Sequence, residues 1–157
     1  MNHYSLYYFK IAHKLRPYDS RMLVALGETY EKLDRYENAI QCYSKACDVG
    51  DIEGIAMYKM ANLHEKLGAL DLAVKCYIMY CNDERAAADK QSLYHGYMTL
   101  ANYYENNGEY DRASHYAYKC LESDDVSIEC IFKKYCIYIF ISFYYSANLK
   151  QNHYLKR

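Results

Sequence analysis

Residues 33–39 read Leu33-Asp34-Arg35-Tyr36-Glu37-Asn38-Ala39, and this stretch decides the fold because it returns twice further along the chain. The copies are Leu67-Gly68-Ala69-Leu70-Asp71-Leu72-Ala73 and Asn107-Gly108-Glu109-Tyr110-Asp111-Arg112-Ala113. Ala39 and Ala73 are 34 residues apart, whereas Ala73 and Ala113 are 40 apart. The six extra residues fall in a polar, alanine-rich stretch around 83–91. We interpret that stretch as an insertion in a loop.

The sequence on either side of each copy repeats as well. Upstream of each copy, a large residue is followed three positions later by an apolar residue, then directly by Gly or Ala, and three positions after that by a ring. The three examples are Leu23-Leu26-Gly27-Tyr30, Met57-Met60-Ala61-His64 and Tyr97-Leu100-Ala101-Tyr104. Downstream come Ala39-Tyr43-Ala46, Ala73-Tyr77-Tyr80 and Ala113-Ala117-Cys120. Spacings of three and four predict an amphipathic helix on each side of the turn. We expect the small pair Gly27 and Ala39 to let two helices approach, and Asp34, Gly68 and Gly108 to mark where the chain reverses.

A helix-turn-helix unit of 34 residues is the tetratricopeptide repeat. The predicted fold is therefore all-α, a tetratricopeptide-repeat superhelix (α-solenoid). Three complete repeats occupy residues 20–53, 54–87 and 94–127, and an inserted loop occupies 88–93. A half-repeat at 1–19 precedes them, because four of its residues lie one period ahead of equivalent ones: Ser5, Phe9, Ala12 and Pro17.

The half-repeat predicts a helix, at about residues 4–15, that lacks the antiparallel partner of a complete unit. Repeat arrays need polar capping units at their ends, and this helix begins with Tyr7-Tyr8-Phe9. We therefore expect the chain to be the C-terminal part of a longer superhelix or the product of a fragmentary gene model. The aromatic-rich tail, residues 128–157, does not follow the repeat. A closing helix, translated non-coding sequence and a membrane tail are its three interpretations, although the apolar run 135–145 is shorter than a spanning helix needs.

Tyrosine is unusually frequent, with 22 residues in a chain that has no Trp. Many tyrosines occupy equivalent repeat positions: Tyr30 with Tyr104, Tyr36 with Tyr110, and Tyr43 with Tyr77. Such a ring can bury a large apolar body while its hydroxyl reaches the solvated rim. We therefore predict that these tyrosines are packing residues of the helix stack.

Charge and motifs exclude several function classes. With 19 Lys+Arg against 20 Asp+Glu, the net charge of −1 argues against a nucleic-acid partner. No catalytic triad, paired catalytic carboxylates or phosphate-binding glycine loop is present.

Seven cysteines without a CxxC pair predict reduced thiols in the cytosol or nucleus. The pairs Cys42/Cys47 and Cys76/Cys81 are spaced too widely for a typical zinc site, so we interpret them as packing residues. We expect no enzyme, metal or cofactor, and no membrane partner.

A stack of helix pairs offers a concave surface lined by the first helix of each unit. The residues predicted to line this peptide groove are Arg21, Val24, Glu28, Glu31 and Lys32 from the first repeat, Ile55, Tyr58, Asn62, Glu65 and Lys66 from the second, and His95, Met98, Asn102, Glu105 and Asn106 from the third. An Asn amide can both donate to and accept from a peptide backbone. The alternative is that each of these side chains only forms a solvated face.

One segment is similar to a known family. It reads Ala12-His13-Lys14-Leu15-Arg16-Pro17-Tyr18-Asp19-Ser20-Arg21-Met22-Leu23-Val24-Ala25-Leu26-Gly27-Glu28-Thr29-Tyr30-Glu31-Lys32-Leu33. It resembles the C-terminal repeats of the cell division cycle protein 23 family, subunit eight of the anaphase-promoting complex. Three shorter stretches also match: Ala46-Cys47-Asp48-Val49-Gly50-Asp51, Leu63-His64-Glu65-Lys66-Leu67 and Ala73-Val74-Lys75-Cys76-Tyr77-Ile78.

The resemblance runs from about Tyr4 to Ser123 and implies a non-catalytic scaffold subunit of a ubiquitin ligase that acts in mitosis. It implies neighbouring complex subunits and a coactivator peptide as partners, in nucleus and cytoplasm. The family's N-terminal repeats, which carry homodimerisation, are absent from this chain. The alternative function is a chaperone-binding repeat module that clamps C-terminal peptides. It would need lysines converging with Asn, whereas Lys32 and Lys66 stand beside Glu31 and Glu65.

Overall fold

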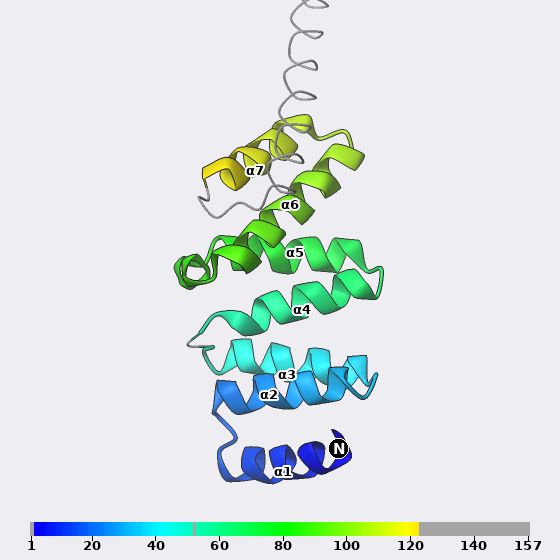
Figure 1. Cartoon of the computed structure of the whole chain (residues 1–157), viewed down its shortest axis with the longest axis vertical. Coiled ribbons are helices and arrows are strands. Elements are labelled where there is room, and N and C mark those ends of the chain that lie inside the picture. The colour runs from blue at the N-terminus through cyan, green and yellow to red at the C-terminus, as the bar shows by residue number, and fades with distance from the viewer. Residues whose placement is uncertain (1, 52, 123–157) are drawn as a thin grey trace, which may run out of the picture. The chain divides into compact units, whose positions relative to one another are not determined.

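The computed structural model describes residues 2–51 and 53–122 (Figure 1). The fold of these residues is all-α, as predicted. These residues form α1 (Asn2–Leu15), α2 (Ser20–Glu31), α3 (Tyr36–Asp48), α4 (Ile55–Lys66), α5 (Leu70–Cys81), the 3₁₀ helix η1 (Glu84–Ala88), α6 (Lys90–Asn106) and α7 (Tyr110–Glu122). None of the helices in this part of the chain is long and apolar enough to cross a membrane. The last five residues of the third repeat and the predicted tail, 128–157, lie outside the described residues.

The helices pack against their neighbours in chain order. Contacts join α1 to α2, α2 to α3, α3 to α4 and α4 to α5, and Figure 1 shows these five helices lying one after another. They belong to a compact unit that ends at Gly96, and a second unit begins at Tyr97. Within the second unit, the ring of Tyr116 stacks on that of Tyr104 at 5.7 Å between centroids and so ties α7 to α6.

The three predicted reversals share one helix-ending geometry. Asp34, Gly68 and Gly108 have φ values of 57°, 75° and 74°. In each turn, the residue after this position donates its backbone N–H to a carbonyl five residues earlier; for the first turn, Arg35 donates to Tyr30 at 2.9 Å. This bond satisfies one of the carbonyls that a helix end leaves unpaired. The structure therefore confirms the turn positions predicted from the repeat.

The insertion differs from the predicted loop at 88–93, because residues 90–93 are already the first turn of α6. Asp89 caps this turn by accepting hydrogen bonds from the backbone N–H of Ser92 at 3.1 Å and from its hydroxyl at 2.7 Å. Asp83 caps η1 in the same way, through the N–H of Arg85 at 2.9 Å. Two local Asp caps thus turn most of the insertion into helix. The Arg85 guanidinium also donates to the carbonyl of Asp51 and so attaches η1 to the turn between α3 and α4.

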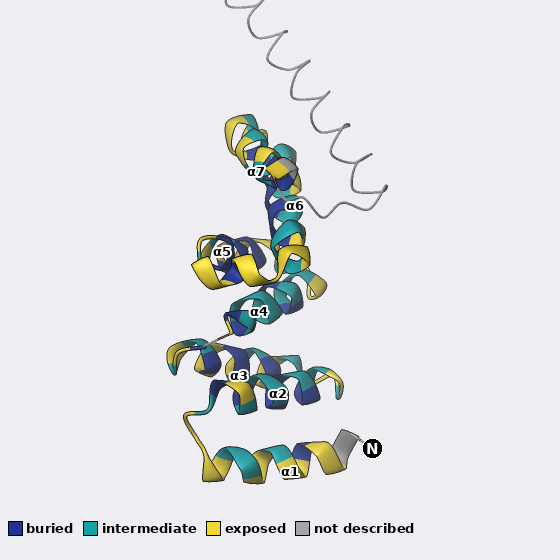
Figure 2. Ribbon diagram, turned by 60° about the vertical axis from the view of Figure 1, so that its left-hand side comes forward, coloured by how far each residue is buried: buried dark blue, intermediate teal, exposed yellow. Residues whose placement is uncertain are grey.

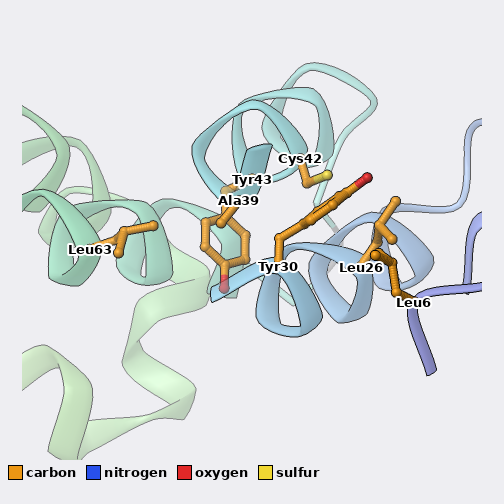
Figure 3. Packing of buried hydrophobic residues seen from close by; sticks show 7 residues of the cluster. All are labelled: Leu6, Leu26, Tyr30, Ala39, Cys42, Tyr43 and Leu63. Atoms are coloured by element: carbon orange, nitrogen blue, oxygen red, sulfur yellow. The ribbon is translucent and has the colours of Figure 1, made fainter. Parts of the chain in front are cut away.

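One core cluster lies between the first four helices (Figure 3). It consists of seven buried residues: Leu6, Leu26, Tyr30, Ala39, Cys42, Tyr43 and Leu63. Tyr43 and its repeat equivalent Tyr77 are both completely buried. Tyr30 and Tyr104, which share another repeat position, are buried too. These burials confirm the packing role predicted for the tyrosines.

Gly27 on α2 and Ala39 on α3 are both buried, and the side chain that lies closest to Gly27 is the ring of Tyr43. A Cβ atom at Gly27 would lie 2.6 Å from Cε1 and 2.9 Å from Cδ1 of the Tyr43 ring. Real Cβ atoms do not approach that closely, and the buried ring cannot turn aside into solvent. The glycine therefore makes room for the tyrosine.

One face of α1 is exposed (Figure 2). Its exposed apolar and aromatic side chains are Tyr4, Tyr7, Tyr8, Ile11 and Leu15. Leu6, on the opposite face, is buried in the core cluster, and Phe9 packs partly buried against it. The helix thus packs on α2 through a narrow stripe.

Replacing Gly27 with Ala tests the contact with Tyr43. Although alanine favours a helix by about 1 kcal/mol over glycine, we expect Gly27→Ala to lower the free energy of unfolding by about 1–3 kcal/mol, because the added methyl overpacks the core. The measurement is urea unfolding followed by circular dichroism. Ser44→Ala on the exposed face of α3 is the control and should change the free energy by less than about 0.5 kcal/mol. A Gly27→Ala protein as stable as the parent would contradict this account.

Candidate peptide-binding groove

An open groove of about 560 Å³ lies between α2 and α4. Its lining comprises Glu28, Glu31, Lys32, Asp34, Tyr36, Lys59, Lys66 and Leu67. Four of these residues were predicted for the groove from the sequence: Glu28, Glu31, Lys32 and Lys66. The structure thus gathers part of the predicted set, from two consecutive repeats, around one cavity.

Two ion pairs cross this groove from α4 to α2. Lys59 Nζ lies 2.9 Å from Glu28 Oε1, and Lys66 Nζ lies 2.5 Å from Glu31 Oε1. All four side chains retain solvent exposure, so each pair contributes only modest stability. The two glutamates lie on the α2 side of the groove and the two lysines on the α4 side, so the groove carries both signs of charge.

In each of the first two repeats, a buried tyrosine donates a hydrogen bond to a glutamate at the equivalent position; Glu31 lines the groove, whereas Glu65 does not. The Tyr43 hydroxyl donates to Glu31 Oε2 at 3.2 Å, and the Tyr77 hydroxyl donates to Glu65 Oε2 at 2.6 Å. Both pairs span twelve residues and are related by one period. Burial, reinforced by the neighbouring glutamate, raises the pKa of both tyrosines far above its ordinary value.

The third repeat cannot form this contact. Its glutamate, Glu105, is present, but the position of the tyrosine is taken by Ala117. Met98, Asn102, Glu105 and Asn106 belong to the second unit, in which Asn102 and Asn106 are exposed and the other two are half-buried. The proposed role of these four residues therefore rests on their repeat positions alone.

Tyr58 and His95 belong to a separate cluster of rings. The Tyr58 ring lies 5.3 Å from that of Tyr80 and 6.1 Å from the imidazole of His95, measured between centroids. His95 Nδ1 also lies 3.3 Å from the Tyr77 hydroxyl. Ring pairs in such tilted and edge-to-face arrangements are favourable by about 0.5–1.5 kcal/mol per pair. The structure thus brings these two predicted residues together, beside Glu65.

Other predicted residues lie away from the groove lining. The guanidinium of Arg21 is exposed and lies 3.9 Å from the carboxylate of Asp19, which caps α2. Val24 packs, partly buried, against the core cluster of Figure 3 and against a second cluster formed by Leu23, Ala46 and Ala56. Ile55 and Asn62, on α4, are half-buried.

Lys59 is a charged residue that lines the groove and was not predicted from the sequence. Its equivalent one period earlier is Ala25, so repeat alignment gave no reason to expect a polar groove residue there. The signal that could have identified Lys59 is charge complementarity, because Glu28 on the preceding repeat offers a carboxylate with which a lysine can pair. Asp34 and Leu67, which belong to the turns, and Tyr36, the first residue of α3, also line the groove and were not predicted to do so.

The cysteines among the described residues are buried or half-buried, as expected for packing residues. Cys42 and Cys76 are buried, and burial raises the pKa of both thiols. Burial together with Asp51 raises the pKa of Cys47 to about 11. Thiols of this kind stay protonated near neutral pH, whereas metal ligation needs thiolate. Within residues 2–51 and 53–122, no three His, Cys, Asp or Glu side chains are grouped as metal ligands.

Comparison with known proteins agrees with the repeat assignment. The tetratricopeptide-repeat family matches residues 20–49 and 94–126. The cell division cycle protein 23 homolog of Caenorhabditis elegans is 37% identical over 91 residues, and anaphase-promoting complex subunit 8 of Arabidopsis thaliana is 32% identical over 95. These matches cover 57% and 59% of this chain but only 14% and 16% of the relatives.

A solved structure shows the same fold. The crystal structure of MamA protein aligns with 78% of this chain and 64% of its own length, at a TM-score of 0.60 and 22% identity. The predicted all-α tetratricopeptide-repeat class is thus confirmed. The predicted resemblance to cell division cycle protein 23 is confirmed for about half of the chain.

The tyrosine–glutamate contacts can be tested by removing the hydroxyl groups. We expect Tyr77→Phe to lower the free energy of unfolding by about 0.5–1.5 kcal/mol. Tyr43→Phe should lower the free energy of unfolding by less, because the hydrogen bond from Tyr43 to Glu31 is longer than that from Tyr77 to Glu65. Both are measured by urea unfolding. The control is Tyr18→Phe, since Tyr18 is 83% exposed, and it should be neutral. Equal stability of Tyr77→Phe and the parent would show that the Glu65 contact contributes nothing.

The raised pKa values predict loss of stability in alkaline solution. Cys47 binds its proton more tightly in the folded state, with a pKa of about 11 against 9.0, so stability is unaffected below about pH 8 and falls as the pH rises from about 9 to about 11. The buried tyrosines add to the loss above their ordinary pKa of 10.0. The urea midpoint should therefore decrease across this window, and less so in Cys47→Ala. A midpoint that stays constant would refute the prediction.

Proposed function

We propose that this chain, whose tetratricopeptide repeats resemble those of cell division cycle protein 23, is a non-catalytic interaction module of an anaphase-promoting complex. It would dock neighbouring subunits and bind a coactivator peptide, in nucleus and cytoplasm. It would thereby serve cell division and ubiquitin conjugation as a scaffold. The proposal includes neither a nucleic-acid nor a membrane partner.

The observation that carries the peptide-binding part is the groove between α2 and α4. Its two cross-groove ion pairs, Lys59 with Glu28 and Lys66 with Glu31, place both signs of charge within reach of one ligand. An extended peptide with mixed charge is complementary to such a surface. The identity of the complex is supported by the similarity to subunit 8 proteins.

The same geometry argues against the alternative, a module that clamps C-terminal carboxylates. A carboxylate clamp needs cations that are available to the ligand, whereas Lys59 and Lys66 are already paired with glutamates. A C-terminal peptide would have to compete with both protein carboxylates. Mixed charge therefore favours an internal peptide segment as the ligand.

The complex can be tested by affinity purification of the tagged chain from dividing cells. We expect other anaphase-promoting complex subunits to be recovered. Recovery of heat-shock chaperones without any subunit of the complex would overturn the proposal in favour of the clamp.

The groove can be tested in the same purification with a charge reversal. Lys59→Glu combined with Lys66→Glu converts both ion pairs into repulsions and should reduce recovery of the groove ligand at least about tenfold, equivalent to about 1.4 kcal/mol. The matched control is Lys75→Glu, because Lys75 is exposed on α5 and does not line the groove. If the double variant recovers the same proteins as this control, the groove is not the binding surface.

A further inference from the structure

A second cavity, of about 260 Å³, lies between α1 and α3 over one side of α2. This is not the groove, which lies between α2 and α4. Leu23, Leu26 and Tyr30 of α2 contribute its apolar lining, and Figure 3 shows Leu26 and Tyr30 beside Cys42 of α3. The cavity is therefore a separate feature of the first compact unit, which the proposed function does not use.

The charged side chains around this cavity are all basic. Lys10 and Lys14 come from α1, Lys45 comes from α3, and His13 stands between the two α1 lysines in the lining. Within the described part of the chain, no carboxylate lines the cavity, and none of the three lysines takes part in an ion pair there. Three like charges that converge without a counter-charge raise the local potential and attract an anion.

The basic character is specific to this place in the repeat. One period along the chain, the positions of Lys10, His13, Lys14 and Lys45 are held by Ser44, Cys47, Asp48 and Met79. The backbone geometry of the repeat therefore does not require positive charge there. The groove on the other side of α2 again differs, since its lysines Lys59 and Lys66 are paired with glutamates.

We propose that the cavity between α1 and α3 binds an acidic peptide segment of a protein partner, with carboxylates at Lys10, Lys14 and Lys45 and an apolar side chain over Leu23 and Leu26. The lining amides of Asn38 and Gln41 can donate to and accept from the peptide backbone. His13 could add a hydrogen bond to the peptide, because its buried Nδ1 has no hydrogen-bond partner among the described residues.

A phosphate-specific site or a nucleic-acid site fits this cavity less well. Its lining, as far as the structure describes it, contains no arginine, so it lacks the fork that binds phosphate in bidentate fashion, whereas lysines act as point charges that suit dispersed carboxylates. Single-stranded nucleic acid needs exposed aromatic faces for stacking. The aromatic ring in this lining, Tyr30, is 8% exposed, and Lys10 Nζ lies 5.7 Å from its centroid.

The test is fluorescence anisotropy with the full chain and a short synthetic peptide in which Asp and Glu flank one Leu. We expect binding that weakens as salt is added, and no binding of the same peptide with Asn and Gln. The triple variant Lys10→Gln, Lys14→Gln, Lys45→Gln should bind about tenfold more weakly. The triple Lys→Arg variant keeps the charges and should still bind. Lys75→Gln is the control for loss of an exposed lysine and should bind like the parent.

Three outcomes would overturn the proposal. The first is that the triple Gln variant binds the acidic peptide as tightly as the parent does. The second is that the parent binds the Asn/Gln peptide as tightly as the acidic peptide. The third is that the parent does not bind the acidic peptide. Tighter binding of a phosphoserine peptide or a thymidine oligonucleotide that the Gln variant also loses would assign the site to that ligand instead.

Circular dichroism of each variant verifies folding. If the triple Gln variant unfolds, the double variant Lys10→Gln, Lys14→Gln replaces it in the same comparison, and binding equal to that of the parent would again overturn the proposal. None of these readouts involves Lys59 or Lys66, so failure here is distinct from failure of the proposed function.

Discussion

The contact of the buried Tyr43 ring with Gly27 is the constraint on which the first two repeats depend. The ring occupies the space that a side chain at residue 27 would need, and its hydroxyl emerges beside Glu31. Glu31 in turn binds Lys66 of the next repeat. Core packing and groove charge are therefore coupled through one side chain, because a ring displaced from α2 would no longer hold the glutamate.

The repeat places two chemically different surfaces on the two sides of α2. On the α4 side, cations and carboxylates pair across the groove, and a ligand complementary to this surface would carry both signs of charge. On the α1 side, the lysines converge without carboxylates among the described lining residues, and a complementary ligand would be an anion. The backbone repeats with a period of 34 residues while the exposed side chains vary freely. One scaffold can thus present unlike surfaces at equivalent positions.

The helices, their turns and the packing tyrosines could be predicted because their signals are local or strictly periodic. Three- and four-residue spacing identifies a helix face, and Asp34, Gly68 and Gly108 recur at the reversals. The loop predicted at 88–93 was wrong because Asp89 caps a helix that begins four residues before the aligned repeat. The contact of the Tyr43 ring with Gly27 was not predicted, for a related reason. Sequence spacing along a helix does not specify which turn of the partner helix lies opposite.

In the candidate site, too, the features that depend on one helix could be predicted from the sequence, whereas those that depend on packing between helices could not. Period and composition alone established an all-α repeat, the face on which Glu28, Glu31, Lys32 and Lys66 stand, and the burial of Tyr43 and Tyr77, because each of these depends on position within one helix. Packing in three dimensions decided that Lys59 joins the groove, that Val24 belongs to the core, and which lysines are paired. Ion pairing depends on the distance between atoms of different helices, and that distance is set by how closely the buried side chains let the helices approach.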